Sequence, residues 1–288
     1  MRPPQPQAAG SAGCARIPNG RCGPGAFAAE GAGTALMMLG GLSGVALCAR
    51  WFPESQSTRL LFIGMLFGAC VTLVALSPLG RRSGAHLNPA VTLAFAALGR
   101  MRPRDVPPYV AVQLAGALAG SLAFRALWGT DVTGVTHIDV SIPAALGLEL
   151  AMTALLIGTI LASGGLAPLA VWPVIVLLTW QGSPFTGTSL NPARSAGPAL
   201  AFQDLADLWI YFPAPLAGAL LAAGVTRLAV TRPHRHGTGS ERKADPGPEG
   251  ARGQERAGHR RQLGDRPGHR GAVRGVRRER RDQLPPAA

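Results

Sequence analysis

Apolar and polar stretches alternate along this chain in a pattern that is typical of a protein crossing a lipid bilayer several times. Between residue 26 and about residue 230, short polar breaks separate long apolar runs. Most of these runs have about 20 residues, which is long enough to span a hydrocarbon core of roughly 30 Å. The pattern predicts six spans, at about residues 26–49, 60–79, 107–128, 142–163, 166–182 and 208–230.

Two further apolar segments are only about half as long as a span. They are residues 88–99 and 191–202, which follow the second and the fifth predicted spans. A segment of this length can enter the bilayer but cannot cross it, and irregular backbone at that depth must be buried in protein or line a water-filled cavity. The pattern therefore predicts an all-α membrane protein with six transmembrane helices and two re-entrant half-helices.

The two halves of the chain repeat each other. The tripeptide Asn-Pro-Ala occurs in both half-helix segments, and matching sequence surrounds it in both halves. The matched pairs are 83–90 with 186–193, 30–36 with 149–155, and 114–118 with 216–220. Because three spans per half is an odd number, the second half must lie upside down relative to the first. Inverted repeats that meet through broken helices build paths across a bilayer.

Composition separates this apolar region from two polar ends. The chain is 47% hydrophobic and has a formal net charge of +13. Residues 232–288 hold 15 Lys and Arg against 7 Asp and Glu, which is +8 of that charge. We predict a disordered segment at 1–25, a membrane domain at 26–231 with inverted repeats at about 26–129 and 142–230, and a basic disordered tail. A basic tail after the last span favours a role in topology or contact with anionic lipid over nucleic-acid binding.

Basic residues also predict the orientation of the chain. Arginines flank the first half-helix and the end of the last span, at Arg81, Arg82, Arg100, Arg102, Arg104, Arg227, Arg232 and Arg235. The loop 129–141 contains no Lys or Arg. We therefore expect a multi-pass protein of the plasma (inner) membrane, with both termini and the first Asn-Pro-Ala segment on the cytoplasmic side.

Each Asn-Pro-Ala is a strong start for a helix, because Asn is a favoured N-cap and Pro is favoured at the first helical position. One copy alone would indicate a capped helix and nothing more. Here two half-helices enter from opposite faces and meet at their N-termini, where each contributes a partial positive charge. Their amides can donate hydrogen bonds toward a shared lumen, and such dipoles exclude protons and cations. The motif residues are Asn88, Pro89, Ala90, Asn191, Pro192 and Ala193.

Arg194 breaks the repeat, because the first copy has Val91 at the equivalent position. An arginine at mid-membrane costs at least about 2.5 kcal/mol and marks a pathway by default. We expect Arg194 to face the lumen, where it repels cations and donates hydrogen bonds to a permeating dipole. His86 lies two residues before the first motif, and we expect it to line the mouth of the pore.

Glu30 and Glu149 occupy matched positions in the first and fourth predicted spans. Two roles fit them: coupling carboxylates of a secondary transporter, or scaffold groups that accept hydrogen bonds from the backbone of the re-entrant loops. One acid in each half favours the scaffold role.

No pattern in the chain predicts an enzyme, a cofactor or a metal site. A nucleophile–base pair, a phosphate-binding loop and a metal-ligand cluster are all missing from the sequence. The spacing of Cys14, Cys22, Cys48 and Cys70 predicts neither a disulfide framework nor a zinc site.

Together these features resemble the major intrinsic protein family, the aquaporins and aquaglyceroporins, over about residues 26–230. Gly-Ala-His-Leu-Asn-Pro-Ala-Val-Thr at 84–92 and Gly-Thr-Ser-Leu-Asn-Pro-Ala-Arg-Ser-Ala-Gly-Pro-Ala at 187–199 are close to the bacterial aquaporin form. The resemblance implies a six-span hourglass, a homotetramer and one pore per protomer. It also implies that two sets of loop carbonyls line the vestibules, those of Gly84, Ala85 and His86 and those of Gly187, Thr188 and Ser189.

The resemblance further implies a narrow aromatic/arginine filter on the outer side of the Asn pair. Arg194 matches the arginine of this filter, and Thr188 matches the loop position beside it. Thr179 occupies the position that is usually His in water-specific members, and this departure widens or softens the filter. The aromatic residue of the second span corresponds to Phe67 if a one-residue length difference is allowed. Otherwise Gly68 falls there and the pore is much wider.

Two positions separate water channels from glycerol channels within the family. Glycerol channels typically have Asp after the filter arginine, whereas this chain has Ser195. Water channels typically carry an aromatic pair in the sixth span, and this chain has Tyr211-Phe212. Both positions favour water, whereas Thr179 favours a more permissive pore.

We therefore predict a passive water channel that excludes ions and protons. A channel for glycerol or other small neutral solutes is the alternative. A secondary transporter and a non-conducting membrane interaction protein are less favoured.

Overall fold

A computed structural model describes residues 22–231 of the chain. The predicted tail at 232–288 and most of the predicted segment 1–25 lie outside this range. The described chain is helical and contains no β-strand. Its α-helices are α1 (Pro24–Trp51), α2 (Gln56–Leu76), α3 (Pro78–Ser83), α4 (Pro89–Ala97), α5 (Val106–Trp128), α6 (Ile142–Ser163), α7 (Ala167–Thr186), α8 (Pro192–Phe202) and α9 (Pro213–Thr231). Three short 3-10 helices are η2 (Pro103–Asp105), η3 (Gly164–Leu166) and η4 (Leu208–Tyr211).

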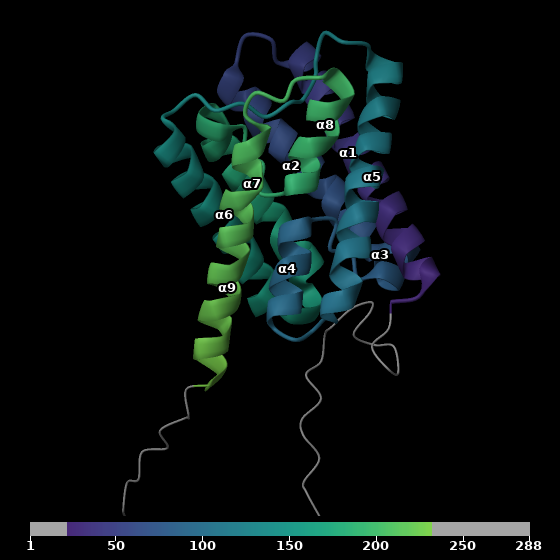
Figure 1. Cartoon of the computed structure of the whole chain (residues 1–288). Coiled ribbons are helices and arrows are strands. Elements are labelled where there is room, and N and C mark those ends of the chain that lie inside the picture. The colour runs from purple at the N-terminus through teal and green to yellow at the C-terminus, as the bar shows by residue number, and fades with distance from the viewer. Residues whose placement is uncertain (1–21, 232–288) are drawn as a thin grey trace, which may run out of the picture. The chain divides into compact units, whose positions relative to one another are not determined.

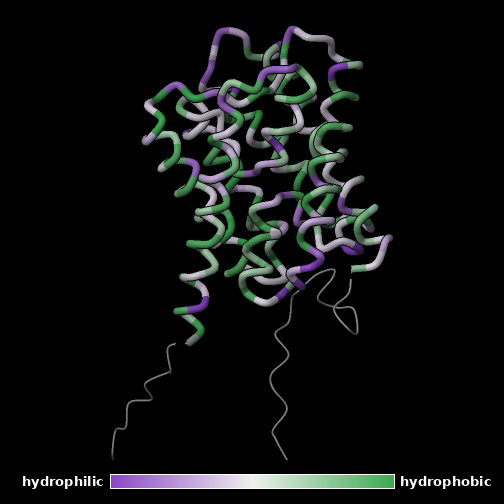
Figure 2. Tube along the Cα trace, in the orientation of Figure 1, coloured by the Kyte–Doolittle hydropathy of each residue, from purple (hydrophilic) through white to green (hydrophobic). Residues whose placement is uncertain are grey.

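Five continuous helical segments in the described chain are long and apolar enough to cross a membrane. One of them, Ile142–Thr186, has 45 residues and contains α6, η3 and α7. A straight helix of that length would measure about 68 Å, more than twice the hydrocarbon thickness. Since α6 and α7 pack against each other, the segment folds back at η3, which is consistent with the six predicted spans. Hydrophilic residues gather at the two ends of the bundle and recur at isolated points inside it (Figure 2).

The second span ends earlier than the sequence predicts. α2 ends at Leu76 rather than at residue 79, and a separate short helix, α3, begins at Pro78. The residue before a proline is disfavoured in helical conformation, and Ser77 accordingly has φ −68° and ψ 168°. The sequence analysis took this stretch as part of one long span and missed α3.

Two other boundaries follow from proline and glycine. α7 continues to Thr186 rather than ending at residue 182, and it ends where Gly187 takes a left-handed φ of 68°. The sixth predicted span begins with η4, and its α-helix starts at Pro213, which suits a first helical position.

Cys22 precedes α1 and is disulfide-bonded, a bond that the spacing of the cysteines does not predict. Spacing patterns detect frameworks of several bridges or metal sites, whereas a single bridge leaves no pattern. Cys48 in α1 and Cys70 in α2 are free thiols.

The helices pack in pairs that follow the repeat. α1 packs on α2 and α5 in the first half, and α6 packs on α7 and α9 in the second. The half-helices cross between the halves, because α4 packs chiefly on α9 and α8 on α5. Figure 1 shows α8 above α4, with the long helices around them. Each half therefore supplies the main packing surface for the half-helix of the other.

Glycines let the paired helices approach closely at equivalent places. A Cβ added at Gly116 of α5 would lie 2.2 Å from the carbonyl oxygen of Gly31 in α1. A Cβ added at Gly218 of α9 would lie 2.4 Å from the carbonyl oxygen of Leu150 in α6. These distances exclude any larger residue, so the repeated Leu-Ala-Gly-Ala-Leu segment is a packing signal.

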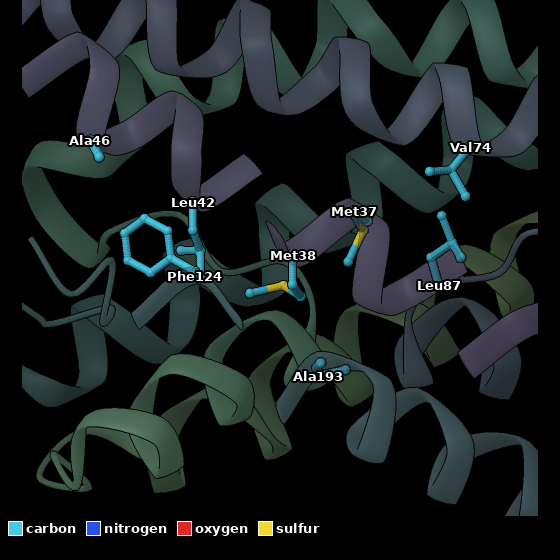
Figure 3. Close-up of a cluster of buried hydrophobic side chains, with 9 residues drawn as sticks. Met37, Met38, Leu42, Ala46, Val74, Leu87, Phe124 and Ala193 are labelled. Carbon is cyan, nitrogen blue, oxygen red and sulfur yellow. The ribbon is translucent and has the colours of Figure 1, made fainter. Parts of the chain in front are cut away.

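The Asn-Pro-Ala segments are anchored in the apolar core. Ala193 is fully buried, and Leu87 is 2% exposed. Figure 3 shows both side chains in one cluster with residues of α1, α2 and α5, namely Met37, Met38, Leu42, Ala46, Val74 and Phe124. The loops before α4 and α8 are thus held inside the protein.

Candidate functional site

The loops before the two half-helices have the same unusual backbone. Three residues in each loop take positive φ, and they occupy equivalent positions. They are Gly84 (99°), Ala85 (49°) and Leu87 (51°) in the first loop, and Gly187 (68°), Thr188 (49°) and Leu190 (55°) in the second. Each left-handed residue other than Gly costs on the order of 1–3 kcal/mol. These loops therefore need bonds from outside to hold their shape.

Glu149 holds the second loop. Its side chain is fully buried in α6. Its carboxylate accepts hydrogen bonds from the backbone N–H of Ser189 and of Leu190, both at 2.9 Å, and from the hydroxyl of Thr186 at 2.7 Å. Both carboxylate oxygens thus accept hydrogen bonds from the loop. The N–H groups of Ser189 and Leu190 lie before α8 and have no acceptor within that half-helix, so Glu149 supplies it.

Glu30 holds the first loop in a related way. It is fully buried in α1 and accepts a hydrogen bond from the backbone N–H of Leu87. Its other donors are side chains, the amide of Gln113 at 2.8 Å and the hydroxyl of Tyr109 at 3.1 Å. The sequence analysis did not single out Gln113 or Tyr109.

Two buried tyrosines fasten the starts of the loops. The hydroxyl of Tyr109 donates to the carbonyl of Ser83, and that of Tyr211 donates to the carbonyl of Thr186 at 2.8 Å. Tyr109 lies 21 residues after Asn88 and Tyr211 lies 20 residues after the second motif Asn. The sequence analysis treated Tyr211 as a marker of solute type and missed this matched spacing, which would have found both tyrosines.

The two Asn side chains join the loops to each other. Nδ2 of Asn88 donates to the carbonyl of Leu190, and Nδ2 of Asn191 donates to the carbonyl of Leu87, both at 2.8 Å. Each amide nitrogen carries two hydrogens, so one is used in this crossed pair and one remains. Asn88 is 5% exposed and Asn191 is 7% exposed.

The same side chains cap the half-helices. Oδ1 of Asn88 accepts from the N–H of Ala90 at 2.8 Å, and Oδ1 of Asn191 accepts from the N–H of Ala193 at 2.9 Å and of Arg194 at 3.3 Å. Pro89 and Pro192 are the first residues of α4 and α8. Both motif alanines are fully buried. A larger side chain at either position would therefore displace the core around it.

One cavity of about 430 Å³ runs past both loops. Eleven of the predicted site residues line it: Phe67, Gly84, Ala85, His86, Asn88, Thr179, Gly187, Thr188, Ser189, Asn191 and Arg194. The motif Pro and Ala residues and the two glutamates lie outside its wall. Among the described residues, the charged side chains on this wall are all arginines: Arg81, Arg100 and Arg194.

Phe67, and not Gly68, lies on the cavity wall. A Cβ at Gly68 would meet the ring of Trp172 at 2.6 Å, so this position faces the contact between α2 and α7. The ring of Phe67 packs over Gly41 of α1 and lies 5.5 Å from the guanidinium carbon of Arg194.

The loop 129–141, which joins the two halves, positions Arg194. Nη1 of Arg194 donates to the carbonyl of Gly134 at 2.9 Å. Beside it, the hydroxyls of Thr136 and Ser195 lie 2.7 Å apart and form a hydrogen bond. The sequence carries no periodic signal for these contacts, because an irregular loop makes them with a distant helix.

Threonines occupy the wall near Arg194. The hydroxyl of Thr188 donates to the carbonyl of Leu178 at 3.1 Å and is thus tied to α7. Thr179 is half-buried, and its hydroxyl makes no hydrogen bond within the described chain. Thr179 therefore offers a free polar group to the cavity.

His86 lies in the first loop, on the cavity wall. Its Nδ1 is 3.1 Å from the hydroxyl of Thr92, and its ring contacts the rings of Phe95 and Tyr109, with centroids 4.7 and 5.2 Å away. The ring is thus held by a hydroxyl and by two aromatic neighbours.

Comparison with known proteins agrees with this geometry. Residues 24–225 match the family model of the major intrinsic proteins. The chain belongs to this family. Members are membrane channels, and the membrane-spanning helices and paired half-helices found here are those of a major intrinsic protein.

Similar family members occur in bacteria and plants. Aquaporin Z of Rhodopseudomonas palustris is 33% identical over an alignment of 228 residues that covers 72% of this chain and 94% of that protein. Aquaporin NIP1-3 of Oryza sativa subsp. japonica is 38% identical over 173 residues, 54% of this chain and 59% of that protein. Aquaporin NIP6-1 of Arabidopsis thaliana is 36% identical over 185 residues, 62% of this chain and 60% of that protein. The chain thus spans about 60% of the length of these two plant relatives.

The fold is shared with a solved structure. The X-ray structure of the aquaglyceroporin from Plasmodium falciparum superposes with a TM-score of 0.62 at 22% sequence identity, over 72% of this chain and 96% of that chain. At this identity the likeness shows the fold of this major intrinsic protein and not its solute.

Proposed function

We propose that this major intrinsic protein is a passive channel for water that excludes ions and protons. The observation that carries the proposal is the crossed Asn pair on the wall of one cavity. Each amide spends one N–H on the opposite loop, and its second N–H is free to donate to a molecule in the cavity. Water that accepts from both amides must turn its oxygen toward them, which interrupts a proton-conducting chain of waters.

The charge of the wall supports the exclusion of cations. The described wall carries arginines and no carboxylate, and the positive ends of α4 and α8 meet beside it. The guanidinium of Arg194 lies over the ring of Phe67, so a cation passing this point would meet a positive charge and an apolar ring that has no oxygen to replace its water.

The two glutamates support passive transport. A coupling carboxylate must exchange a proton or a cation with the pathway. Both oxygens of Glu149 accept hydrogen bonds from the second loop, and Oε1 of Glu30 accepts from the N–H of Leu87 and from the amide of Gln113. Neither acid lies on the cavity wall. We therefore assign both to the scaffold and not to ion coupling.

Thr179 keeps a second candidate function open. A threonine is smaller than a histidine, and its free hydroxyl on the cavity wall can bond to a solute hydroxyl. This observation favours glycerol or another small neutral solute as a further permeant. Ser195 and the aromatic pair at Tyr211 favour water.

We further propose a homotetramer in the plasma (inner) membrane with both termini in the cytoplasm. The first half-helix supports this orientation. Arg227 donates to the carbonyl of Ala97 at the end of α4, and Arg100 lies over the ring of Phe95 at 5.8 Å. Positive charge thus gathers at the end of the bundle where the described chain begins and ends (Figure 1).

Stopped-flow light scattering on proteoliposomes tests the function. A sorbitol gradient is expected to shrink liposomes that hold the protein much faster than empty liposomes. Shrinkage at the empty-liposome rate would refute a water channel and favour a non-conducting membrane protein. Rapid re-swelling in a glycerol gradient would establish the second candidate, and uphill accumulation of solute under a proton gradient would establish a transporter.

A matched pair of variants controls for protein incorporation. Thr179→Trp fills the cavity wall and is expected to lower water flux strongly. Leu177→Trp places the same bulk two residues away on α7, at a side chain that is 50% exposed, and is expected to leave flux unchanged. Equal flux in the two variants would mean that water does not pass Thr179.

A further inference from the structure

The loop 129–141 is pinned over the cavity at successive residues. Gly134 accepts from Arg194, and Thr136 bonds to Ser195. Further along, the N–H of Ile138 donates to Oδ2 of Asp207 at 3.2 Å. The N–H of Asp139 then donates to the carbonyl of Phe185 at 2.8 Å. Since Gly134 is itself on the cavity wall, the position of this loop decides where Arg194 finds its acceptor.

His137 is at the centre of these contacts and lies between two carboxylates. Its Nε2 is 3.2 Å from Oδ2 of Asp204, and its Nδ1 is 3.4 Å from Oδ2 of Asp207. A carboxylate accepts hydrogen bonds but does not donate them, and a neutral imidazole has only one N–H. Both contacts are favourable only when the ring carries two protons. When it carries one, a nitrogen lone pair faces a carboxylate oxygen.

The other charged groups nearby are engaged elsewhere. Arg125 of α5 donates to the carbonyl of Ala201 and lies over a ring of α8. Arg194 is bonded to the loop carbonyl. Asp131 and Asp139 belong to the same loop and form no ion pair within the described chain. Asp204 and Asp207 are thus the two carboxylates that face the ring of His137.

We propose that His137 is a positioning residue for Arg194. With two protons, its ring clamps the loop 129–141 to Asp204 and Asp207, and the loop in turn presents the Gly134 carbonyl to the arginine. Loss of one proton releases the clamp and lets this carbonyl withdraw. The guanidinium then turns to acceptors in the cavity and lies across the lumen, so that water flux falls as pH rises. This inference rests on the proposed function, because it concerns flux through that cavity.

The expected effect is modest, because the clamp is partly open to solvent. The side chain of His137 is 51% exposed and that of Asp204 is 42% exposed. Exposed charge networks of this kind shift a two-state equilibrium by a factor of about two to five.

Two single substitutions at His137 separate the effect of its positive charge from the effect of losing the imidazole ring. Water permeability is measured by stopped flow at about pH 5.5 and about pH 8, the limits between which histidine titrates. Wild type is expected to be about two- to fivefold more permeable at the lower pH. His137→Lys keeps a positive charge and is expected to stay near the high value at both pH values. His137→Gln is neutral and is expected to stay near the low value at both.

The outcomes of this experiment test the clamp and the proposed function separately. Wild type that conducts water equally at both pH values, or His137→Gln that keeps the full pH response, would overturn the clamp and leave the proposed function standing. Wild type that conducts no water at either pH would refute the proposed function. In that case amide hydrogen exchange of residues 129–141, corrected for intrinsic pH dependence, tests the clamp by itself. Exchange that is slower at low pH in wild type, and not in His137→Gln, supports it, and equal exchange contradicts it.

Discussion

The loops 84–88 and 187–191 share a backbone but differ in the side chains that they show to the cavity. Both begin with a left-handed Gly, both keep a left-handed Leu before the Asn, and both Asn side chains cross to the other loop. Within the loops the differences lie at Ala85 against Thr188 and at His86 against Ser189, and just beyond them Val91 corresponds to Arg194. The repeated residues build the scaffold, and the departures from the repeat set the chemistry of the wall.

The two supporting acids differ in what they hold. Glu149 accepts two backbone N–H groups of its loop, whereas Glu30 accepts one and fills its remaining capacity with Tyr109 and Gln113. Both of those side chains also bond elsewhere, to Ser83 and Thr92. The second loop therefore depends on its acid more than the first loop does.

The largest expected effect is that of Glu149→Ala. It leaves two buried backbone donors without an acceptor, which costs roughly 2–6 kcal/mol at about 1–3 kcal/mol per group. Glu30→Ala leaves one buried backbone donor, the N–H of Leu87, without an acceptor. Its loss of stability is expected to be about half that of Glu149→Ala. Thermal unfolding of the two variants in detergent gives both values. A larger loss in Glu30→Ala would invert the comparison.

Arg194→Val gives the second half-helix the residue of the first. With the guanidinium gone, glycerol flux is expected to rise about tenfold, equivalent to a barrier lowered by ~1.4 kcal/mol, and protons to leak. Glycerol re-swelling and a pH-sensitive dye inside the liposomes measure the two fluxes. Val91→Ala changes the equivalent position and is expected to leave both unchanged. Unchanged discrimination in Arg194→Val would place the filter elsewhere.

Thr179→His puts a larger side chain on the wall of the cavity that Arg194 also lines, and it narrows the cavity there. Glycerol flux is expected to fall about threefold, equivalent to ~0.7 kcal/mol, while water flux is largely kept. The isosteric Thr179→Val keeps the width and removes the hydroxyl, so it separates size from hydrogen bonding. If glycerol flux is the same in wild type and in Thr179→His, the residue is not part of the filter.

The smallest expected effect is the difference between Asn88→Ala and Asn191→Ala. The crossed bonds are equal in length, but Oδ1 of Asn191 caps two N–H groups and that of Asn88 caps one. Asn191→Ala is therefore expected to be less stable in thermal unfolding by under about 1 kcal/mol. A gap of several kcal/mol would show that the two crossed bonds are not equivalent.

Much of the architecture could be predicted from the sequence, because membrane spans are set by the length of apolar runs and helix starts by local capping chemistry. The Asn-Pro-Ala pair could be found because the tripeptide occurs in both halves, and Arg194 because the first half has Val91 at the equivalent position. The sequence analysis took the bend at Ser77 and Pro78 as part of one continuous helix. Phe67 and Gly68 are neighbours on this span, and the structure distinguishes them because only Phe67 lies on the cavity wall.

The remaining parts of the site rest on contacts between distant segments. The Gly134 carbonyl that receives Arg194, and the Leu carbonyls that receive the two Asn side chains, are backbone groups that any residue would provide. No residue type marks them, so the sequence does not reveal them. Tyr109 is an exception, because its spacing from the first motif Asn nearly equals the spacing of Tyr211 from the second motif Asn. This match between the repeats could have identified Tyr109 from the sequence.

The crossed packing of the half-helices has a consequence for how the protein is made. During synthesis α4 leaves the ribosome long before α9, yet α9 is the helix against which α4 chiefly packs. The acceptor of Asn88 lies in the second half as well. The first half-helix thus lacks its main partner until the last span has entered the membrane. The first three spans inserted alone form an unfinished intermediate, and completion of the pathway across the bilayer waits for the insertion of α9.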